Sequence, residues 1–475
     1  VFARLLTTSR YHSYLNDIGI QKFKTKYRKD RYYMALIVKK PKGTEDIVPS
    51  KVYKWHTVEK IVSEAAEIYG FKEIRVPTFE ETGLFVRSVG ETTDVVQKEM
   101  YSVSAAGDSK FALRPEGTSG TMRAVLENGI LNEGLPQKVY YILSCFRHEN
   151  TQKGRLREFH QFGCEMVGSE SPRADAEVIS LAKSVLDRAG LRNIKLNINS
   201  IGCPTCRAEY RKALKEYFAA RKDQLCETCR DRLDKNPMRI LDCKIKHCQE
   251  LGKDAPVILD YLCDDCKEHF EKLQEYLSVM GIDFDINPKI VRGLDYYTRT
   301  VFEFITDEIG AQGTVCGGGR YDGLIQQLGG KPTPALGFGL GLERLLMVMD
   351  AQGCDYMEPK TCDLYIVPMG EDALKKAMGI ASELREEGCF VEYDLIGKGL
   401  NAQMKYANKT GAKFVMVLGD NEIESGVAKL KNMATGEQTD IKLDSTIAEN
   451  FSNALMADMF KDIDADIEKF IGKDN

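Results

Sequence analysis

Residues suited to holding a polar ligand gather between Cys145 and Glu165. A strand-like alternation there places an aromatic ring, an amide, a gap and a carboxylate on one face: Phe159, Gln161, Gly163 and Glu165. A strand that faces an apolar core would not carry these residues. Arg147 and Glu149 lie nearby, across a basic hairpin. The pattern favours a sheet face that binds a polar ligand, and an ordinary solvated hairpin is the alternative.

Three further segments carry residue types suited to the same ligand. Glu116 and Thr118 stand two apart around a glycine, an arrangement suited to gripping an ammonium group. The run Arg292-Gly-Leu-Asp-Tyr-Tyr297 brings a guanidinium and two phenols to a turn that enters a strand. The run from Gly337 to Arg344 combines close-packing glycines with an arginine at a helix start. Taken singly, each is more typical of a capped turn or of helix packing than of a site.

The elements that must position these residues can be read from the hydrophobic pattern. A helix is predicted from Pro49 to Gly70, and the run Val139 to Phe146 predicts a strand of an antiparallel sheet. Residues 171–190 read as a second helix. From Asp363 onward, apolar runs alternate with helical stretches, which predicts a small α/β domain with largely parallel strands.

Composition excludes several classes of protein. The chain has 475 residues, of which 43% are hydrophobic and 29% charged, so it is neither a disordered chain nor a fibre. Its net charge of −5 does not indicate a nucleic-acid binder, so any such binding must come from local patches. The sequence has no run of 18 apolar residues, so no membrane span is predicted. It also lacks the Gly-x-x-x-x-Gly-Lys-Ser/Thr loop that binds phosphate in many nucleotide-binding proteins. A nucleotide site would therefore need a sheet with arginine clamps.

The matched segments together resemble the histidyl-tRNA synthetase family, whose members are class II aminoacyl-tRNA synthetases. The resemblance extends from Met34 to Leu443 and rests on three degenerate class motifs and two histidine-specific ones. In chain order they are Tyr69 to Pro77, Phe146 to Glu165, Arg292 to Tyr297, Gly317 to Gly323, and Gly337 to Arg344. The two histidine-specific segments, Arg292 to Tyr297 and Gly317 to Gly323, make the resemblance close.

The resemblance implies a role for each polar residue of these segments. Histidine would be bound by Glu116, Thr118, Gln161, Glu165, Tyr296 and Tyr297. ATP would be bound by Arg147, Glu149, Phe159 and Arg344, and the catalytic arginines would be Arg147, Arg292 and Arg344. Glu165 and Tyr297 would read the imidazole, because its neutral form has one donor and one acceptor nitrogen. A substrate without those nitrogens would leave both groups buried and unpaired.

The activity that the resemblance implies is that of a histidine–tRNA ligase, a homodimeric cytoplasmic enzyme with no membrane contact. Such an enzyme activates L-histidine with ATP and Mg²⁺ to histidyl-adenylate and then transfers the histidyl group to the 3′ end of tRNA(His). Because the attacking carboxylate is already an anion, catalysis would consist mainly of orientation and charge stabilisation at phosphorus.

The fold that follows is α/β in class, with an α+β catalytic domain built on a central antiparallel sheet flanked by helices. We expect the following parts: a basic leader of doubtful function at 1–33, the catalytic domain at 34–198 and 271–355, a Cys-rich helical insertion at 199–270, an anticodon-binding domain at 361–445 and a helical tail at 446–475. The leader carries a net charge of +6 and precedes Met34, which resembles a natural start.

The Cys-rich insertion contains two Cys-x-x-Cys pairs. Cys203 and Cys206 precede Cys226 and Cys229 at a spacing typical of a four-thiolate zinc site. Cys243, His247, Cys248, Cys263 and Cys266 could complete a second site. The family's chemistry uses no zinc, so we predict a structural Zn²⁺ on the first four cysteines, with free thiols as the alternative.

Two other functions compete with the ligase. A non-catalytic regulatory subunit of ATP phosphoribosyltransferase keeps the central sheet but lacks the tail domain and the Arg292 to Tyr297 motif. A class II synthetase for Gly, Thr or Pro would lack the couple of Glu165 and Tyr297. The tail domain, the Arg292 to Tyr297 motif and the pair of Glu165 and Tyr297 are all present here, which favours the histidine enzyme.

Overall fold

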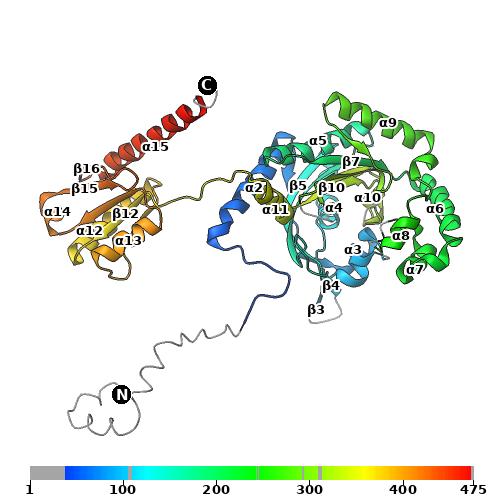
Figure 1. Cartoon of the computed structure of the whole chain (residues 1–475), viewed down its shortest axis with the longest axis horizontal. Coiled ribbons are helices and arrows are strands. Elements are labelled where there is room, and N and C mark those ends of the chain that lie inside the picture. The colour runs from blue at the N-terminus through cyan, green and yellow to red at the C-terminus, as the bar shows by residue number, and fades with distance from the viewer. Residues whose placement is uncertain are drawn as a thin grey trace, which may run out of the picture. The chain divides into compact units, whose positions relative to one another are not determined.

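The computed structural model describes residues 38–91, 93–104, 110–241, 243, 245–290, 294–308 and 313–471, and side chains as far as residue 460. The predicted basic leader and Arg292 lie outside the described residues. The chain divides after Met357 into two compact units, which are described separately (Figure 1). No helix among the described residues is both long and apolar enough to cross a membrane.

The first unit is built on an eight-stranded sheet. Its strands pair in the order β1-β5-β6-β11-β10-β9-β7-β8, and only the two outer pairs, β1 with β5 and β7 with β8, are parallel. The bounds are β1 Lys72–Glu73, β5 Gln137–Phe146, β6 Glu158–Val167, β7 Lys195–Ser200, β8 Asp285–Ile286, β9 Thr298–Ile305, β10 Thr314–Arg320 and β11 Ala335–Gly341. The predicted central antiparallel sheet is confirmed. The glycines from Gly337 to Gly341 lie in β11, and Arg344 lies at the start of α11 as predicted.

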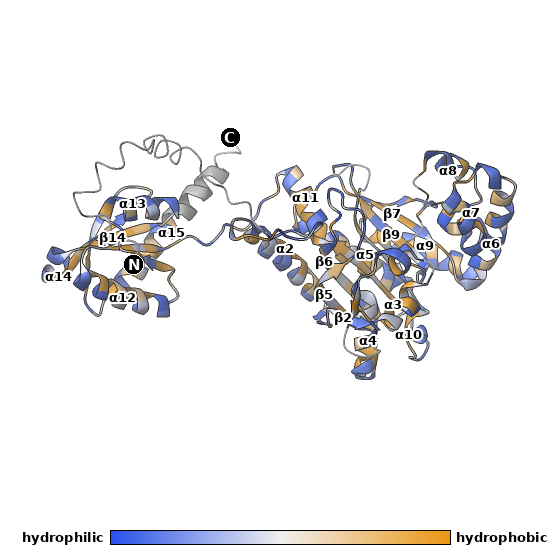
Figure 2. Cartoon of the chain, turned by 90° about the horizontal axis from the view of Figure 1, so that it is seen from below, coloured by the Kyte–Doolittle hydropathy of each residue, from blue (hydrophilic) through white to orange (hydrophobic). Residues whose placement is uncertain are grey.

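One face of this sheet packs against four helices and forms the main core. They are α2 Pro49–Ile68, α5 Pro172–Arg188, α9 Asp264–Val279 and α11 Leu342–Gln352. Phe162, Cys164 and Met166 of β6 are buried there beside residues of these helices. The apolar strands and helix stripes of this layer are visible in Figure 2. The predicted first helix is confirmed, and Gly70 closes it at a φ of +79°, where a side chain would be strained.

The opposite face carries shorter elements. They are α3 Thr82–Val89, the π-helical turn η1 Val95–Glu99, α4 Thr118–Glu127, the turn η2 Ile130–Glu133, α10 Leu324–Gln327, and a small sheet of β2 Phe79–Glu81, β4 Lys110–Leu113 and β3 Ser102–Ser104. These elements cover only part of the sheet. The residues of β6 that alternate with Phe162, such as Phe159 and Gln161, therefore point away from the main core toward this partly covered face.

The Cys-rich segment folds into short helices with a core of their own. They are α6 Pro204–Ala219, η3 Lys222–Gln224, α7 Glu227–Lys235, η4 Pro237–Ile240, α8 Lys246–Leu251 and η5 Ile258–Tyr261. Tyr210, Leu214 and Phe218 of α6 are buried in it together with Leu233 of α7. The next helix, α9, spans the domain limit expected at residue 270 and belongs to the main core through Phe270 and its neighbours. The domain limits remain predictions.

The second unit is a five-stranded sheet with four helices among the described residues. Its strands pair in the order β13-β12-β14-β15-β16. The bounds are β12 Leu364–Pro368, α12 Glu371–Glu386, β13 Val391–Tyr393, α13 Leu400–Lys409, β14 Phe414–Leu418, α14 Asp420–Ser425, β15 Val427–Asn432, β16 Gln438–Lys442 and α15 Ile447–Ile471. Strands β13, β12 and β14 are parallel as predicted, whereas the hairpin of β15 and β16 makes the sheet mixed. Gly436, at a φ of +77°, lies in the turn of that hairpin.

Candidate active site

A cavity of about 670 Å³ opens on the face of the first sheet that the main core does not use. Its size suits a small-molecule ligand. Among the described residues predicted to bind substrate, all but Glu165 line it: Glu116, Thr118, Arg147, Glu149, Phe159, Gln161, Tyr296, Tyr297 and Arg344. These residues come from distant stretches of sequence, and the sheet brings them into one wall.

Strand β6 supplies the floor through its alternate residues. Phe159 and Gln161 line the cavity, whereas Phe162 between the sheet and the helices is fully buried. The neighbouring strand β11 approaches this face closely because it carries glycines. A Cβ at Gly339 would lie 2.2 Å from Nε2 of Gln161, and one at Gly337 would lie 1.9 Å from Oε2 of Glu165. The glycines therefore leave room for the polar side chains of β6.

The start of α4 forms one end of the floor. Glu116 is buried and accepts hydrogen bonds from the backbone N–H groups of Thr118 at 2.8 Å and Ser119 at 2.9 Å. Free N–H groups at a helix start favour such a carboxylate. The backbone N–H of Gly117 donates to Oε1 of Gln161 at 3.0 Å. Helix α4 and strand β6 thus fix the acid and the amide beside each other.

Glu165 lies behind the cavity wall and is fully buried. Its carboxyl accepts hydrogen bonds from the hydroxyls of Thr118 at 2.7 Å and Tyr141 at 3.1 Å, and from the hydroxyl of Tyr321. Burial raises the pKa of Glu165 to about 8, although the hydroxyl donors oppose that rise. When it is ionised, the carboxylate offers about four lone-pair sites, so three donors leave about one for a ligand.

Tyr141 and Tyr321 were not predicted from the sequence. Tyr321 stands inside the Gly317 to Gly323 motif, so its position was flagged but its hydroxyl was not. Tyr141 looked like one more apolar residue of strand β5. Its ring fits between two glycines, because a Cβ at Gly117 or at Gly163 would lie 2.2 Å from it.

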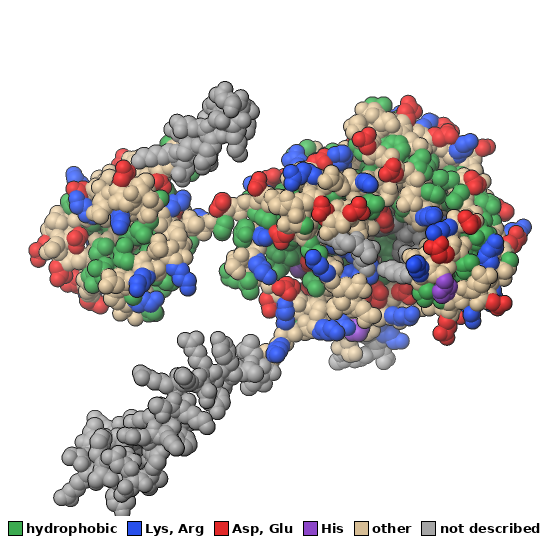
Figure 3. Space-filling view, in the orientation of Figure 1, with side chains coloured by type: hydrophobic (Ala, Val, Ile, Leu, Met, Phe, Trp, Pro, Cys, Tyr) green, Lys and Arg blue, Asp and Glu red, His purple; other side chains and the backbone are tan. Residues whose placement is uncertain are grey.

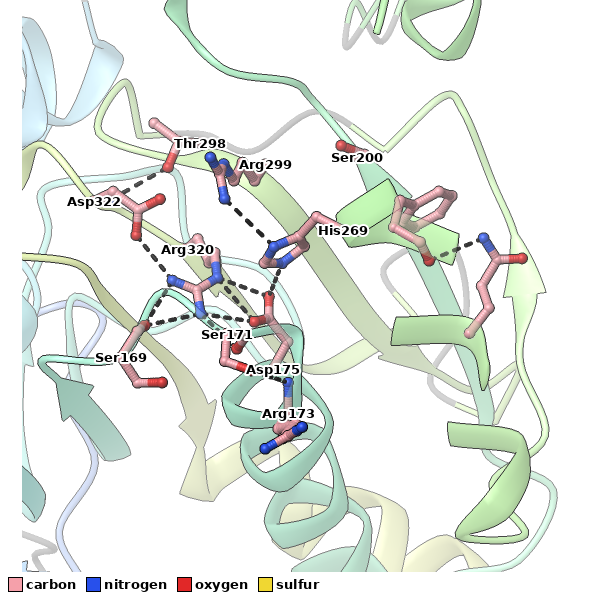
Figure 4. A network of polar contacts seen from close by, with 12 residues as sticks. Ser169, Ser171, Arg173, Asp175, Ser200, His269, Thr298, Arg299, Arg320 and Asp322 are labelled. Carbon is pink, nitrogen blue, oxygen red and sulfur yellow. Dashed lines mark hydrogen bonds and ion pairs between the residues drawn. The ribbon is translucent and has the colours of Figure 1, made fainter. Parts of the chain in front are cut away.

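A buried ion pair holds the end of β10, which carries Tyr321. Arg320 and Asp175 are both fully buried, and their charged atoms lie 2.8 Å apart (Figure 4). Arg320 also donates to Asp322 at 3.0 Å and to backbone oxygens of the turn before α5. Burial alone would raise the pKa of Asp175, but the Arg320 guanidinium and the His269 ring hold it below its ordinary value. The network anchors Tyr321 to α5 and α9.

Guanidinium groups also line the cavity. Arg147 lies 5.2 Å from the centre of the Phe159 ring and donates to the Pro115 oxygen at 2.8 Å. Arg344, in the first turn of α11, donates to the Thr314 oxygen at 2.7 Å. Burial, and next to it the charge of Arg155, lowers the pKa of Arg344. Such a cluster of cations in a half-buried site favours a polyanion.

The cavity also contains residues that sequence reasoning did not assign. Arg155 lines it and pairs with Glu149 at 3.1 Å, and Glu303 accepts from the Thr314 hydroxyl at 3.2 Å. Arg232 and Arg239 reach the wall from α7 and η4 of the Cys-rich segment and form ion pairs with Asp94 at 3.3 Å and Asp295 at 3.1 Å. The run of residues before β9 thus meets the insertion directly.

The predicted zinc site on Cys203, Cys206, Cys226 and Cys229 is wrong in its grouping. The first pair lies with Cys263 and Cys266, and the second pair lies with Cys243 and Cys248. Helix α6 separates the two predicted pairs, and its 16 residues span about 24 Å at 1.5 Å per residue. One ion therefore cannot reach both pairs. His247 belongs to neither group.

Comparisons with known proteins agree with one another. The family model described as Histidyl-tRNA synthetase matches residues 43–345, and that described as Anticodon binding domain matches residues 363–450. A curated histidine–tRNA ligase of Acetivibrio thermocellus is 55% identical over 413 residues, which cover 87% of this chain and 99% of that relative. One from Clostridioides difficile is 49% identical over 421 residues, covering 88% of this chain and 100% of that one. The apo S. aureus histidyl-tRNA synthetase structure has a TM-score of 0.75 at 37% identity and covers 87% of this chain and 100% of its own.

Proposed function

This chain belongs to the histidyl-tRNA synthetase family, and we propose that its cavity activates histidine with ATP before the histidyl group passes to tRNA. The observation that carries the proposal is the convergence of Gln161, Tyr297 and Arg344 on one cavity beside the Glu165 network. A polar pocket for an amino acid adjoins a cluster of guanidinium groups for phosphate. The regulatory-subunit alternative is not favoured, because the curated relatives that match most of the chain are ligases.

At the histidine end, Glu116 and Gln161 would bind the ammonium group together with Thr118. Their fixed positions at the start of α4 support this role. Tyr297, which is only 6% exposed, and the remaining acceptor site of Glu165 would read the imidazole. Tyr296 packs against Tyr297 with ring centres 4.7 Å apart and would hold its orientation. The specificity would follow from the cost of leaving these buried groups unpaired beside a different amino acid.

At the ATP end, Phe159 would stack on the adenine, and Arg147, Arg292 and Arg344 would hold the phosphates. An oxygen of the histidine carboxylate attacks the α-phosphorus, and the bond from that phosphorus to the bridging oxygen of pyrophosphate breaks. The products are histidyl-adenylate and pyrophosphate. The arginines would stabilise charge on the phosphoryl oxygens, which is the main demand of this step.

Carboxylates at the cavity wall fit the magnesium ion that the family uses. Glu149 and Glu303 both line the cavity, and oxygen ligands of this kind are those that Mg²⁺ takes beside substrate phosphates. When bound, the ion neutralises charge on the departing pyrophosphate. The salt bridge of Glu149 with Arg155 would keep its carboxylate in place before ATP arrives.

The second step would involve tRNA(His). A ribose hydroxyl at its 3′ end attacks the carbonyl carbon of the adenylate, and AMP leaves. The unit after Met357 matches the anticodon-binding model, which supports tRNA as its partner. Basic and acidic side chains are interspersed on the face of both units seen in Figure 3, so charge alone does not identify the RNA surface. We further propose a homodimer and a cytoplasmic location, in line with the family.

Amino-acid-dependent pyrophosphate exchange with all 20 amino acids tests the proposal. Exchange with histidine and with no other amino acid is expected. Exchange with glycine, threonine or proline would identify a different class II synthetase. A folded protein with no exchange for any amino acid would contradict the ligase and favour the regulatory role.

A further inference from the structure

Eight cysteines of the first unit form two quartets of sulfur atoms. The first quartet is Cys203, Cys206, Cys263 and Cys266, and the second is Cys226, Cys229, Cys243 and Cys248. Within each quartet all sulfur atoms lie within 4.8 Å of one another. Both quartets combine cysteines from the starts of two different helices or turns, so each ties together segments that are far apart in the chain.

The spacing of the sulfur atoms matches a metal site and not a disulfide. Cys203 Sγ lies 3.6 Å from that of Cys206 and 3.9 Å from that of Cys263, and Cys226 Sγ lies 3.9 Å from that of Cys243. Four sulfurs at about 2.3 Å from a tetrahedral Zn²⁺ are separated by about 3.8 Å. A disulfide would need about 2.05 Å. None of these eight cysteines forms a disulfide.

The surroundings suit thiolates. The backbone N–H of Cys263 donates to Sγ of Cys206 at 3.1 Å, and that of Cys226 donates to Sγ of Cys248 at 3.4 Å. Donors of this kind around the ligands stabilise a metal-bound thiolate and orient it. The helices α6 to α8 have a small core, and small folds with little core depend on disulfides or metals for stability.

We propose that each quartet binds one Zn²⁺. We further propose that the ion of the first quartet positions the tyrosine loop, the turn before β9 that carries Tyr296 and Tyr297 of the histidine pocket. Cys203 and Cys206 stand at the start of α6, and Cys263 and Cys266 stand at the start of α9. Binding joins the two helix starts by four metal–sulfur bonds. The proposal rests on the proposed function only for its second part, since zinc content does not depend on activity.

Three hydrogen bonds connect the first quartet to that loop. Arg207, next to Cys206, donates from Nη1 to the backbone oxygen of Tyr297 at 2.9 Å. The backbone N–H of Arg299 donates to the Gly202 oxygen at 2.9 Å, and that of Ile201 donates to the Arg299 oxygen at 2.7 Å. These contacts hold Tyr297 directly and fix Arg299, two residues further on in β9. A shift of the α6 start would therefore move the phenol that is proposed to read the imidazole.

The second quartet fixes the far end of the insertion. Cys226 and Cys229 stand at the start of α7, whose Arg232 reaches the cavity wall. Its partners Cys243 and Cys248 flank the start of α8. This ion would hold the insertion in the shape that carries α7 to the wall. Because the second quartet joins different helices from the first, a substitution in one quartet can remove its ion and leave the other site intact.

Metal analysis of the full chain, expressed with zinc in the medium and purified without chelator, tests the first part. We expect two zinc ions per chain in the unaltered protein and in Cys389→Ser, a control in the second unit that changes a partly buried cysteine outside both quartets. Cys203→Ala and Cys229→Ala should each lose one ion. Cys203→His should keep both, since histidine is a zinc ligand. X-ray absorption should show sulfur at about 2.3 Å.

Because an altered chain can fail to fold, the unaltered protein is also titrated with an organomercurial that captures thiolates. Release of two zinc ions as the eight thiols react supports the proposal. Absence of zinc, iron in its place, or a zinc content unchanged by both alanine variants overturns it.

Steady-state pyrophosphate exchange tests the second part. Cys203→Ala should raise the KM for histidine about tenfold or more with a much smaller change for ATP, and Cys203→His should restore it. If Cys203→Ala loses zinc, stays folded and keeps the KM for histidine, the positioning role is refuted while the zinc sites stand. If no form of the protein exchanges with histidine, the proposed function fails and the metal analysis still decides the zinc sites.

Discussion

Gly339→Ala should damage histidine binding although it replaces none of the residues proposed to bind histidine. The new methyl group would lie 2.2 Å from Nε2 and 3.1 Å from Cδ of Gln161, so it cannot be accommodated with that side chain in place. Both atoms belong to the end of a flexible side chain, which can swing aside at less cost than a strand. The expected result is a folded protein whose Gln161 amide is displaced from the Gly117 N–H, to which it is now bonded at 3.0 Å.

The size of the effect follows from the bond that Gln161 is proposed to make. A hydrogen bond to a charged group contributes about 1.5–3 kcal/mol, and each 1.4 kcal/mol is a factor of ten, so kcat/KM for histidine should fall by about 10- to 100-fold. The KM for ATP should change little, because Gln161 is not among the residues proposed to bind ATP. Histidine-dependent pyrophosphate exchange, with each substrate varied in turn, measures both quantities.

A double-mutant cycle isolates the cause. If the methyl group acts by displacing Gln161, Gly339→Ala should have little further effect in a Gln161→Ala background, where the clash is absent. Equal losses in both backgrounds, or an unchanged kcat/KM in the single variant, would refute the reasoning. Thermal unfolding of each protein checks that the strand is intact.

Four further substitutions test the buried charges and the arginines. Glu165→Gln should remove a pH dependence of stability. The pKa of this carboxyl is raised to about 8, so its contribution to the free energy of unfolding is fully present below about pH 4.5 and is lost as the pH rises toward 8. Over that window, urea unfolding should show the stability of the variant rising relative to that of the unaltered protein, by several kcal/mol at most. Asp175→Ala leaves the Arg320 guanidinium buried and unpaired and should lower the free energy of unfolding by about 3–5 kcal/mol, also measured in urea; a loss below 1 kcal/mol would contradict the burial argument. Arg292→Ala and Arg344→Ala should each slow pyrophosphate exchange about 10²-fold or more, as for loss of one preorganised donor, and an unchanged rate would remove that arginine from the phosphate site.

Local patterns carried most of the fold because they are set by local physics. The period of two in β6 could be read from Phe159, Gln161 and Glu165, since neighbouring side chains of a strand must point to opposite faces. The first helix and its closing glycine were equally local. The antiparallel hairpin at Gly436 was not predicted. Its second strand, β16, buries only Ile441 and so carries little apolar pattern.

The site was harder to predict where a residue's role depends on its neighbours across the sheet. Glu165 was singled out by its position on a polar face, but its partner hydroxyls come from Tyr141 in β5 and from Tyr321, which directly follows β10. Nothing in the local sequence shows that either hydroxyl bonds to Glu165. The glycines of β11 were noted as close-packing. Only the register of β11 against β6 says that Gly337 is opposite Glu165.

The cysteine pairs show the same limit most directly. The prediction considered only the number of residues between Cys206 and Cys226, which is 19. A flexible loop of that length could close on one ion. In the fold those residues are mostly α6, a rod that holds its two ends apart. Once that helix exists, each pair must find ligands elsewhere, and the segment from 243 to 266 provides them in chain order: Cys243 and Cys248 at the far end of α6, then Cys263 and Cys266 back at its start. The chain thus runs out along α6 and returns, and a ligand pair at each end is what such a path requires.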